Sequence, residues 1–430
     1  MTKFLIAFAL SYAGIAGDPN QGPVSNGESV NPVVQWNKNL LAIVRTPGAQ
    51  PATIHPTRSF AIMHAAIYDA VNSIDRKHRP YLVRFRASRH ASQEAAAAVA
   101  AHDVLIALYP AFESALDAEL QQSLAQIPDE ESKKEGIRIG QAVAERILTL
   151  RSDDGSSAEP VPYVFGTAPG DYQSTPPNFP PQPQFTHWSR VHPFALRRSS
   201  QFRPGPPPAL TSDRYADAFN QIKSVGVAEG TTATADEMLT GRFWNGPIQN
   251  YWNEIAQSAS TGRHLTTARS ARLFALLNLS FADAVIGFYE AKYVYNFWRP
   301  VTAIRAADTN DNPETKPDPN WLPLVGNTPP DPSYPGAHAV ISGAGAEVLI
   351  SFLERDSFNL TVSSEVLPGV ERSFTSFSAA AEEASMSRVF AGVHFNFDET
   401  AGQRMGRRIA EFVFDHFLTR AQRHGEDEDK

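Results

Sequence analysis

Residues 273–305 read LFALLNLSFADAVIGFYEAKYVYNFWRPVTAIR, and this stretch decides the fold. An apolar run that contains Asn278 and Asp283 and follows Arg272 indicates a core helix of a globular protein, not a membrane span. Because Pro300 stops or kinks a helix, we expect this helix over residues 266–297. Asp283 is expected to be a buried carboxylate with a partner near the site, the alternative being a surface position.

Two cations stand near the end of this predicted helix. Lys292 and Arg299 are seven residues apart, so on a continuous helix they would share a face about two turns apart. Two cations on one face are suited to hold an anion between them. The alternative is an ordinary solvated basic edge.

The sequence predicts further helices on both sides of this stretch. Phe60, Met63, Ile67, Val71 and Ile74 recur three or four residues apart, which indicates the buried face of one helix. We expect helices over residues 56–151, with a break near Pro128, and over residues 212–225, 234–240, 338–355 and 379–418. No stretch shows several short alternating strands joined by hairpin turns. The predicted fold class is therefore all-α, with two helical bundles.

A proline-rich connection over residues 151–210 separates the two predicted bundles. It contains thirteen of the 33 prolines of the chain, which excludes both helix and central strand. Aromatic residues are interleaved with the prolines, so we expect the connection to pack on the protein. The predicted organisation is an N-terminal helical region (18–150), this connection, a C-terminal bundle (211–420) and an acidic tail (421–430).

The N-terminus resembles a short signal peptide over residues 1–17. Lys3 precedes the apolar stretch FLIAFALSYAGIAG, which is too short to anchor the chain in a membrane. This pattern predicts a secreted or periplasmic protein. The alternative is a frayed terminal helix of a cytosolic protein.

The composition excludes several classes of function. The chain has no cysteine, which excludes thiol nucleophiles, disulfides, iron–sulfur clusters and Cys-bound zinc. It has no HExxH motif for zinc hydrolysis. Its net charge of −8 argues against a nucleic-acid partner, and we expect no membrane span. The sequence leaves open whether the chain forms a homo-oligomer.

A second candidate segment, residues 331–350, reads DPSYPGAHAVISGAGAEVLI. His338 stands where a helix of small residues begins. The free N–H groups and the positive dipole end at such a helix start attract an anion, and a histidine there can give or take a proton. The alternative is a loop histidine without a chemical role.

A third candidate segment, residues 385–408, reads SMSRVFAGVHFNFDETAGQRMGRR. Arg388 and His394 are six residues apart, about 240° around a helix, so one straight helix cannot bring them together. Gly392 offers a break through which they converge. Asp398 then lies one turn beyond His394 and can accept its second ring proton. The alternative is a surface turn in which Asp398 serves only as an N-cap.

Together the three segments resemble the signature of the vanadium-dependent haloperoxidases and of their relatives, the type 2 phosphatidic acid phosphatases. That signature reads Lys, six residues, Arg-Pro; then Pro-Ser-Gly-His; then Ser-Arg, five residues, His, three residues, Asp. The first and third parts match here without departure, and the middle part reads PGAH, which keeps only Pro335 and His338. Residues 56–418 look like bacterial-type haloperoxidase-like proteins. Because the stand-alone phosphatases are usually much shorter, the long N-terminal half favours the haloperoxidase branch.

The resemblance implies a vanadate cofactor, with His394 bound to the vanadium. Phosphate is nearly isosteric with vanadate and can occupy the same site. The residues that the resemblance assigns to cofactor binding are Lys292, Arg299, Gly336, Ala337, Arg388 and His394.

The resemblance also implies the reaction. Hydrogen peroxide would oxidise a halide, bromide or iodide more readily than chloride, and the oxidised halide would react with a small organic acceptor. The implied catalytic residues are His338 as acid or base, His394, and Asp398, which orients His394. The same residues support two alternatives: an acid phosphatase that forms a phosphohistidine, and a helical protein that binds an anion without turnover.

Four positions depart from the family pattern. Ala337 replaces a glycine whose backbone also donates, and it should be tolerated unless a positive φ is needed there. Gly336 replaces a serine, which removes one donor to the anion, a loss of about 1 kcal/mol. Asp331 stands where chlorinating members often carry an aromatic residue, and we expect it to repel halide or to raise the pKa of His338. Asn245 stands where relatives often have Asp, which would remove one arginine partner.

Overall fold

The computed structural model describes residues 31–49 and 55–421. The predicted signal peptide and residues 422–430 of the predicted acidic tail lie outside the described residues. Thirteen α-helices and one two-stranded sheet account for the regular structure of the described residues, apart from three short 3-10 helices. The predicted all-α fold class is confirmed.

Five α-helices precede the proline-rich connection and eight follow it. The first five are α1 (Pro32–Arg45), α2 (His55–Asp75), α3 (Gln93–Leu108), α4 (Glu113–Ala125) and α5 (Glu130–Arg151). The others are α6 (Asp213–Val225), α7 (Ala235–Phe243), α8 (Ile248–Gly262), α9 (Thr267–Tyr295), α10 (Pro300–Arg305), α11 (Ala337–Leu353), α12 (Phe377–Phe390) and α13 (Asn396–His416). The 3-10 helices are η1 (Pro110–Phe112), η2 (Trp188–Arg190) and η3 (Ala307–Thr309).

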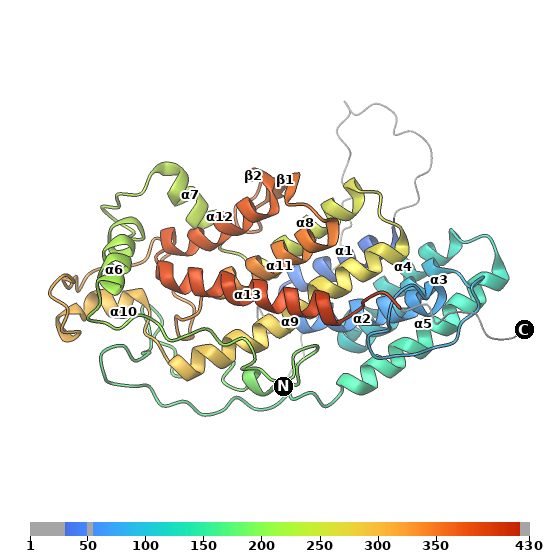
Figure 1. Ribbon diagram of the computed structural model, residues 1–430, viewed down its shortest axis with the longest axis horizontal. Coiled ribbons are helices and arrows are strands. Elements are labelled where there is room, and N and C mark those ends of the chain that lie inside the picture. The colour runs from blue at the N-terminus through green and yellow to red at the C-terminus, as the bar shows by residue number, and fades with distance from the viewer. Residues whose placement is uncertain (1–30, 50–54, 422–430) are drawn as a thin grey trace, which may run out of the picture. The chain divides into compact units, whose positions relative to one another are not determined.

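Helix α9 is the central element of the fold. It packs against α2 from the N-terminal half and against α11 and α13 from the C-terminal half (Figure 1). One continuous hydrophobic cluster includes side chains of all these helices, so the two predicted bundles share α9 and a common core. By length and composition α9 could cross a membrane, as could α3 taken together with residues 110–125, but 94% of the apolar window of α9 is buried in the protein.

The end of α9 corrects one prediction from the sequence. The helix stops at Tyr295, because Asn296 adopts a left-handed conformation with φ of 50°. Arg299 lies beyond this stop and directly precedes α10, which Pro300 begins. The prediction that Lys292 and Arg299 share one helical face is therefore wrong. A turn, and not helical periodicity, brings the two side chains together.

The break predicted at Gly392 is confirmed. Helix α12 ends at Phe390 and α13 begins at Asn396. Gly392 has φ of +83°, a conformation that glycine adopts without steric cost. The break near Pro128 is also confirmed, since α4 ends at Ala125 and α5 begins at Glu130.

Glycine residues allow α11 and α13 to approach closely. A Cβ atom added to Gly402 would lie 2.6 Å from the carbonyl oxygen of Gly336, and one added to Gly406 would overlap the carbonyl oxygen of Val340. Such contacts are shorter than van der Waals packing allows, so only glycine permits this helix spacing. The contact fixes the start of α13 against the start of α11.

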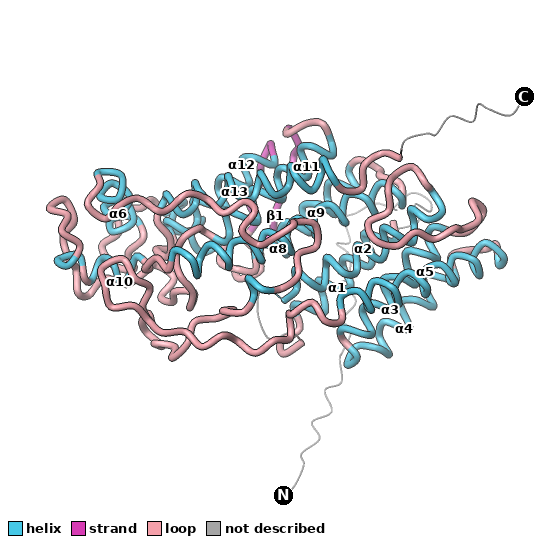
Figure 2. Tube along the Cα trace, turned by 60° about the horizontal axis from the view of Figure 1, so that its bottom comes forward, coloured by secondary structure: helices cyan, strands magenta, loops and turns pink. Residues whose placement is uncertain are grey.

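The proline-rich connection packs against the protein, as predicted. Its side chains Tyr172 and Trp188 are 0% and 1% exposed, and Figure 2 shows the segment as a long run of loop. Asp283 of α9 holds it through three hydrogen bonds of 2.7 Å, from the backbone N–H groups of residues 194–196. Asp283 is thus buried with partners, as expected, but these partners belong to the connection and not to the candidate site.

Four elements, apart from the 3-10 helices, were not predicted from the sequence. These are α1, α8, α10 and a hairpin in which β1 (Ser357–Ser363) pairs antiparallel with β2 (Glu371–Ser376). The strands are short, and only Leu360, Val362 and Phe374 are buried, so their alternation is too brief to be distinct in the sequence.

The close approach of α11 and α13 leads to a stability prediction. Replacing Gly406→Ala should lower the free energy of unfolding by about 1–3 kcal/mol, since the added methyl group overpacks the contact with Val340. This loss should appear although alanine has the higher helix propensity. Urea unfolding followed by circular dichroism measures it. Gly205→Ala is the control, because a Cβ atom there would have nothing within 4 Å; equal losses in both variants would contradict the argument.

Candidate active site

A cavity of about 350 Å³ lies where the three candidate segments meet. Its walls come from the start of α8, the last turns of α9, the loop before α11, the start of α11, and the α12–α13 turn. All five basic residues singled out from the sequence line it: Lys292, Arg299, His338, Arg388 and His394. The structure therefore brings together the side chains that the three segments contribute.

Lys292 and Arg299 are both buried, with exposed fractions of 0% and 1%. The Lys292 ammonium group donates to the carbonyl oxygens of Pro332 and Ser333. Burial lowers the pKa of Lys292 to about 8. The Arg299 Nε atom donates to the carbonyl oxygen of Asp331 over 2.8 Å, so the loop before α11 holds both cations.

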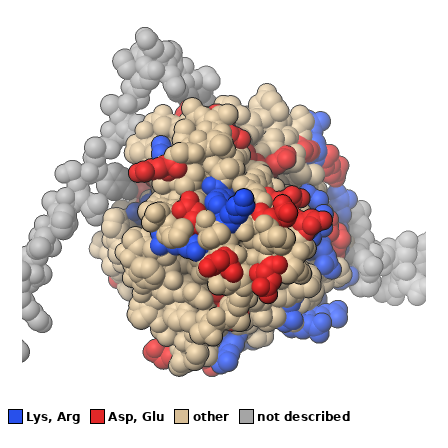
Figure 3. Space-filling model, turned by 90° about the vertical axis from the view of Figure 1, so that its left-hand side faces the viewer, with Lys and Arg blue, Asp and Glu red and all other residues tan. Residues whose placement is uncertain are grey.

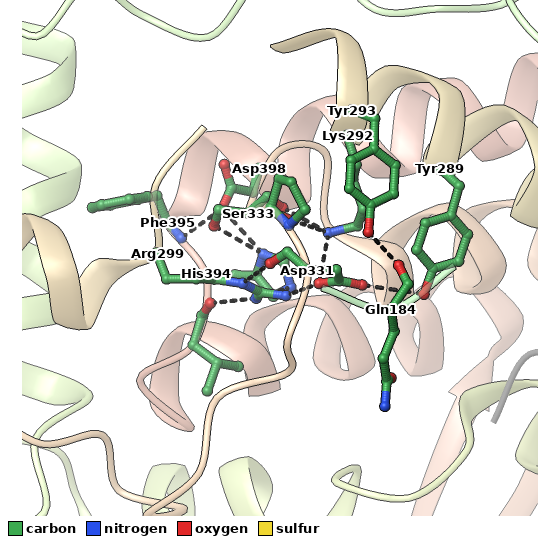
Figure 4. A network of polar contacts seen from close by, with 12 residues as sticks. Gln184, Tyr289, Lys292, Tyr293, Arg299, Asp331, Ser333, His394, Phe395 and Asp398 are labelled. Atoms are coloured by element: carbon green, nitrogen blue, oxygen red, sulfur yellow. Dashed lines mark hydrogen bonds and ion pairs between the residues drawn. The ribbon is translucent and has the colours of Figure 1, made fainter. Parts of the chain in front are cut away.

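Asp331 lies between these two cations (Figure 4). Its Oδ1 atom accepts from Arg299 Nη2 and lies 3.5 Å from Lys292 Nζ. Its Oδ2 atom accepts from the Tyr289 hydroxyl over 3.1 Å. Burial alone would raise the pKa of Asp331, but Lys292 and Arg299 hold it below its ordinary value. Asp331 is thus an ionised carboxylate in the wall of the cavity.

The ring orientation of His394 is fixed by its two nitrogen atoms. Nδ1 lies 3.1 Å from Asp398 Oδ2, and Nε2 lies 2.9 Å from Arg299 Nη1. Because the guanidinium group can only donate, Nε2 carries the lone pair and Nδ1 carries the proton. Burial, followed by Arg299 and Lys292, lowers the pKa of His394 well below its ordinary value, so the ring is neutral.

Asp398 both orients His394 and caps α13. Its Oδ2 atom also accepts from the backbone N–H of Phe395 over 3.0 Å and from the Ser333 hydroxyl over 2.6 Å. Burial raises the pKa of Asp398 to about 6. The two roles that the sequence left open for Asp398, orienting the imidazole and capping the helix, are therefore both present.

His338 at the start of α11 has a defined tautomer as well. Its Nε2 atom lies 3.0 Å from the carbonyl oxygen of Trp244 and 3.2 Å from that of Gly246. Carbonyl groups only accept, so Nε2 carries the proton and Nδ1 alone can take up another. Burial, and then Arg388, lower the pKa of His338 well below its ordinary value. The expectation that Asp331 raises this pKa is wrong, because Asp331 is bound to Lys292 and Arg299.

Arg388 is the cation with the fewest protein partners in the cavity. Its Nη1 atom donates to Asn245 Oδ1 over 2.9 Å, and its buried Nε atom has no hydrogen-bond partner. We expected Asn245, which replaces an Asp, to remove one partner of an arginine. The hydrogen bond to Arg388 is in fact kept, and only the negative charge of an Asp is missing. Burial lowers the pKa of Arg388 to about 10, so it stays charged at neutral pH.

Gly336 does not take the role expected of it. Its N–H donates to the carbonyl oxygen of Asp398 over 3.0 Å, and it does not line the cavity, whereas Ala337 does. The space of a side chain at position 336 is filled by the carboxyl group of Glu399, which a Cβ atom there would overlap. Neither carboxyl oxygen of Glu399 has a hydrogen-bond partner, and burial, followed by Asp398, raises its pKa well above the ordinary value.

Ser333, Tyr289 and Glu399 were not predicted from the sequence. Ser333 and Tyr289 gave no signal, because their contacts depend on the path of the loop before α11. Glu399 could have been found, since it lies three and seven residues before Gly402 and Gly406 and thus on the stripe of α13 that faces α11.

Comparisons with known proteins agree with this geometry. Residues 272–423 match the family described as the VCPO second helical-bundle domain. The C-terminal bundle is thus similar to the second helical-bundle domain of this family. The resemblance inferred from the three sequence segments is confirmed.

A vanadium chloroperoxidase of Curvularia inaequalis is 25% identical to the chain over 371 residues, which cover 66% of this chain and 60% of that protein. The chain thus spans less than two thirds of the length of this haloperoxidase.

Two solved haloperoxidase structures share the fold. A bacterial vanadium-dependent iodoperoxidase superimposes with a TM-score of 0.77 at 24% identity, over 92% of this chain and 99% of the other. A holo-type bacterial vanadium-dependent chloroperoxidase gives a TM-score of 0.68 at 17% identity, over 88% and 95%. At these identities the likeness concerns the fold.

The donor set of the cavity fits an oxoanion such as the vanadate of this family. The buried, unpartnered Nε atom of Arg388 and the lone pair on His394 Nε2 are atoms that such a group would engage. To bind a metal, Nε2 has to give up its hydrogen bond from Arg299. Among the described residues, no cluster of three or more His, Asp or Glu side chains could hold a metal ion.

The outer surface near this site does not have one sign of charge. Figure 3 shows the face at the end with α6 and α10, where Lys and Arg side chains lie beside Asp and Glu side chains. In its described part, this face therefore has no basic patch of a single sign, whereas three buried cations line the cavity.

The low pKa of Lys292 leads to a prediction for anion binding. As the pH rises through about 8, Lys292 loses its proton and its positive charge, so the affinity for sulfate should fall. A bound anion favours the charged lysine, which places the apparent midpoint at or above that pH. Titration calorimetry with sulfate measures the change, and Lys292→Met should bind weakly at every pH. A decline of the same size in Lys292→Met would show that another group is responsible.

Proposed function

We propose that the protein is a vanadate-dependent haloperoxidase that oxidises bromide or iodide with hydrogen peroxide. The observation that supports this proposal is the convergence of three cations and two neutral histidines on one cavity. His394 would hold vanadate through Nε2, and Lys292, Arg299 and Arg388 would donate to its oxygen atoms. When bound, vanadate supplies a Lewis acid that activates hydrogen peroxide.

The residues around this group have separate tasks. Asp398 keeps the proton of His394 on Nδ1, so that the lone pair of Nε2 stays directed at the cofactor. The cations neutralise the charge of the oxygen atoms, and their burial strengthens this effect. The amides at the start of α11, beginning with Ala337, add a positive dipole end beside the cavity.

His338 is suited to receive a proton. Its low pKa keeps the ring neutral, and Nδ1 is the nitrogen atom free to accept. A neutral base beside the cofactor can take a proton from hydrogen peroxide as it enters. The same neutrality makes His338 a poor acid for a leaving group, which favours peroxidase over phosphatase chemistry.

The cavity also has an apolar side for a small organic acceptor. Val285, Phe288 and Ile341 line it together with Pro329 and Pro330. Asp331 places a negative charge in the same wall, which disfavours halide binding. We therefore propose bromide or iodide as the halide, since both are oxidised more readily than chloride.

A phosphatase is the second candidate, because Asp398 orients His394 for attack as it would in a phosphotransfer enzyme. His394 Nε2 would attack phosphorus, the leaving oxygen would take its proton from the protonated form of His338, and water would then cleave the phosphohistidine. A third candidate is an anion-binding protein without turnover. Asp331 forms ion pairs with two of the three cations, and this observation favours the binding protein.

The His394→Ala variant tests the leading proposal. With orthovanadate and hydrogen peroxide, the bromination or iodination of a cyclic dione should fall by about 10³-fold or more, because the variant lacks the side chain proposed to bind the metal. His90→Ala, at an exposed position, is the control. Aryl phosphate hydrolysis that vanadate inhibits, without halogenation, would support the phosphatase instead. Anion binding without either activity would support the binding protein.

We also propose that the protein is exported, on the basis of residues 1–17. Expression of the full chain in a bacterial host, followed by N-terminal sequencing of the protein from the periplasm or medium, tests this. A mature N-terminus near residue 17 is expected. Intact protein confined to the cytoplasm would contradict export.

A further inference from the structure

The cavity contains an anion of its own, the carboxylate of Asp331. It contacts Arg299 and Lys292, receives the Tyr289 hydroxyl, and is 7% exposed. Figure 4 shows it among the groups that would surround an oxoanion. Because Arg299, Lys292 and Tyr289 all hold this carboxylate, we expect it to stay in the cavity wall when a ligand binds.

This carboxylate divides the three cations into two kinds. Lys292 and Arg299 are paired with a negative charge, whereas Arg388 has only the neutral Asn245 as its side-chain hydrogen-bond partner. With Asp331 ionised and both histidines neutral, the cavity wall carries three positive charges and one negative charge. A bound oxoanion must share two of its cations with Asp331.

The repulsion between Asp331 and a ligand grows with the charge of the ligand. By Coulomb's law a dianion at a given distance is repelled twice as strongly as a monoanion. Burial reduces solvent screening in the cavity, so we expect this difference to change relative affinity by about tenfold.

We propose that Asp331 is a specificity-determining residue that makes this site select singly charged tetrahedral oxoanions over doubly charged ones. The inference rests on the proposed function only in that it takes the cavity to be an oxoanion site. It bears on which anion the protein carries. Near neutral pH vanadate is chiefly a monoanion, whereas phosphate is a mixture of monoanion and dianion, so a charge filter of this kind favours vanadate.

Two tetrahedral ions that do not change protonation near neutral pH test the proposal without complications from pH. Perrhenate is a monoanion and sulfate is a dianion. Their affinities for the full chain, prepared without vanadate, are measured by titration calorimetry at constant ionic strength. In Asp331→Asn the affinity for perrhenate should rise about 10-fold and that for sulfate about 100-fold, because the effect on log affinity is proportional to ligand charge.

Matched variants separate charge from shape. Asp331→Glu keeps the charge and should keep the wild-type ratio of the two affinities. Asp308→Asn removes the same charge at an exposed position and should change neither affinity. Because Asp331→Asn leaves two buried cations without a carboxylate, its folding is checked by the rise in Tm that sulfate produces, which should exceed that of the wild type.

Each outcome is decisive. An equal gain for both ions in Asp331→Asn, or no gain, would overturn the charge filter while leaving the oxoanion site in place. If neither the wild type nor any variant binds vanadate, perrhenate or sulfate, the proposed function falls together with the filter. A gain for sulfate about the square of the gain for perrhenate would establish the filter, whichever activity the site has.

Discussion

Burial of three cations at one place is the constraint on which the rest of the structure depends. Lys292, Arg299 and Arg388 are at most 3% exposed, and an unpaired buried charge is very costly. The protein offsets this cost with a loop that turns its carbonyl oxygens toward Lys292 and Arg299, and with the carboxylate of Asp331. Arg388 receives the least compensation, and this makes its side of the cavity the natural place for an external anion.

The scaffold around these charges is held by contacts that are themselves polar or unusually close. Asp283 ties the proline-rich connection to α9 through three backbone N–H groups. Asp69 of α2 likewise accepts hydrogen bonds from the backbone N–H groups of residues 81–83, which ties the segment after α2 to this helix. Gly402 and Gly406 bring α13 against α11. His338 therefore rests on α11 and His394 on the turn directly before α13, while the charged loop before α11 sets the electrostatics.

The sequence carried much of this information in its motifs. The all-α class, the core helix over α9, the breaks near Pro128 and Gly392 and the meeting of five basic side chains could all be predicted, because they depend on local patterns and on spacing. The contact between Asp331 and the two cations could not, since it depends on a turn after Tyr295 that periodicity does not show. The short hairpin and the unpartnered Nε atom of Arg388 likewise depend on tertiary packing and could not be predicted.

The pairing of Gly336 with Glu399 has a consequence for the engineering of this site. The two residues are 63 positions apart, yet a carboxyl group from one occupies the volume that the other lacks. A serine at position 336 would meet this carboxyl group, which is the far end of a flexible side chain, so Glu399 would have to move to admit the serine. The effect of a Gly336→Ser change is therefore coupled to the conformation of Glu399, and the two positions have to be redesigned together.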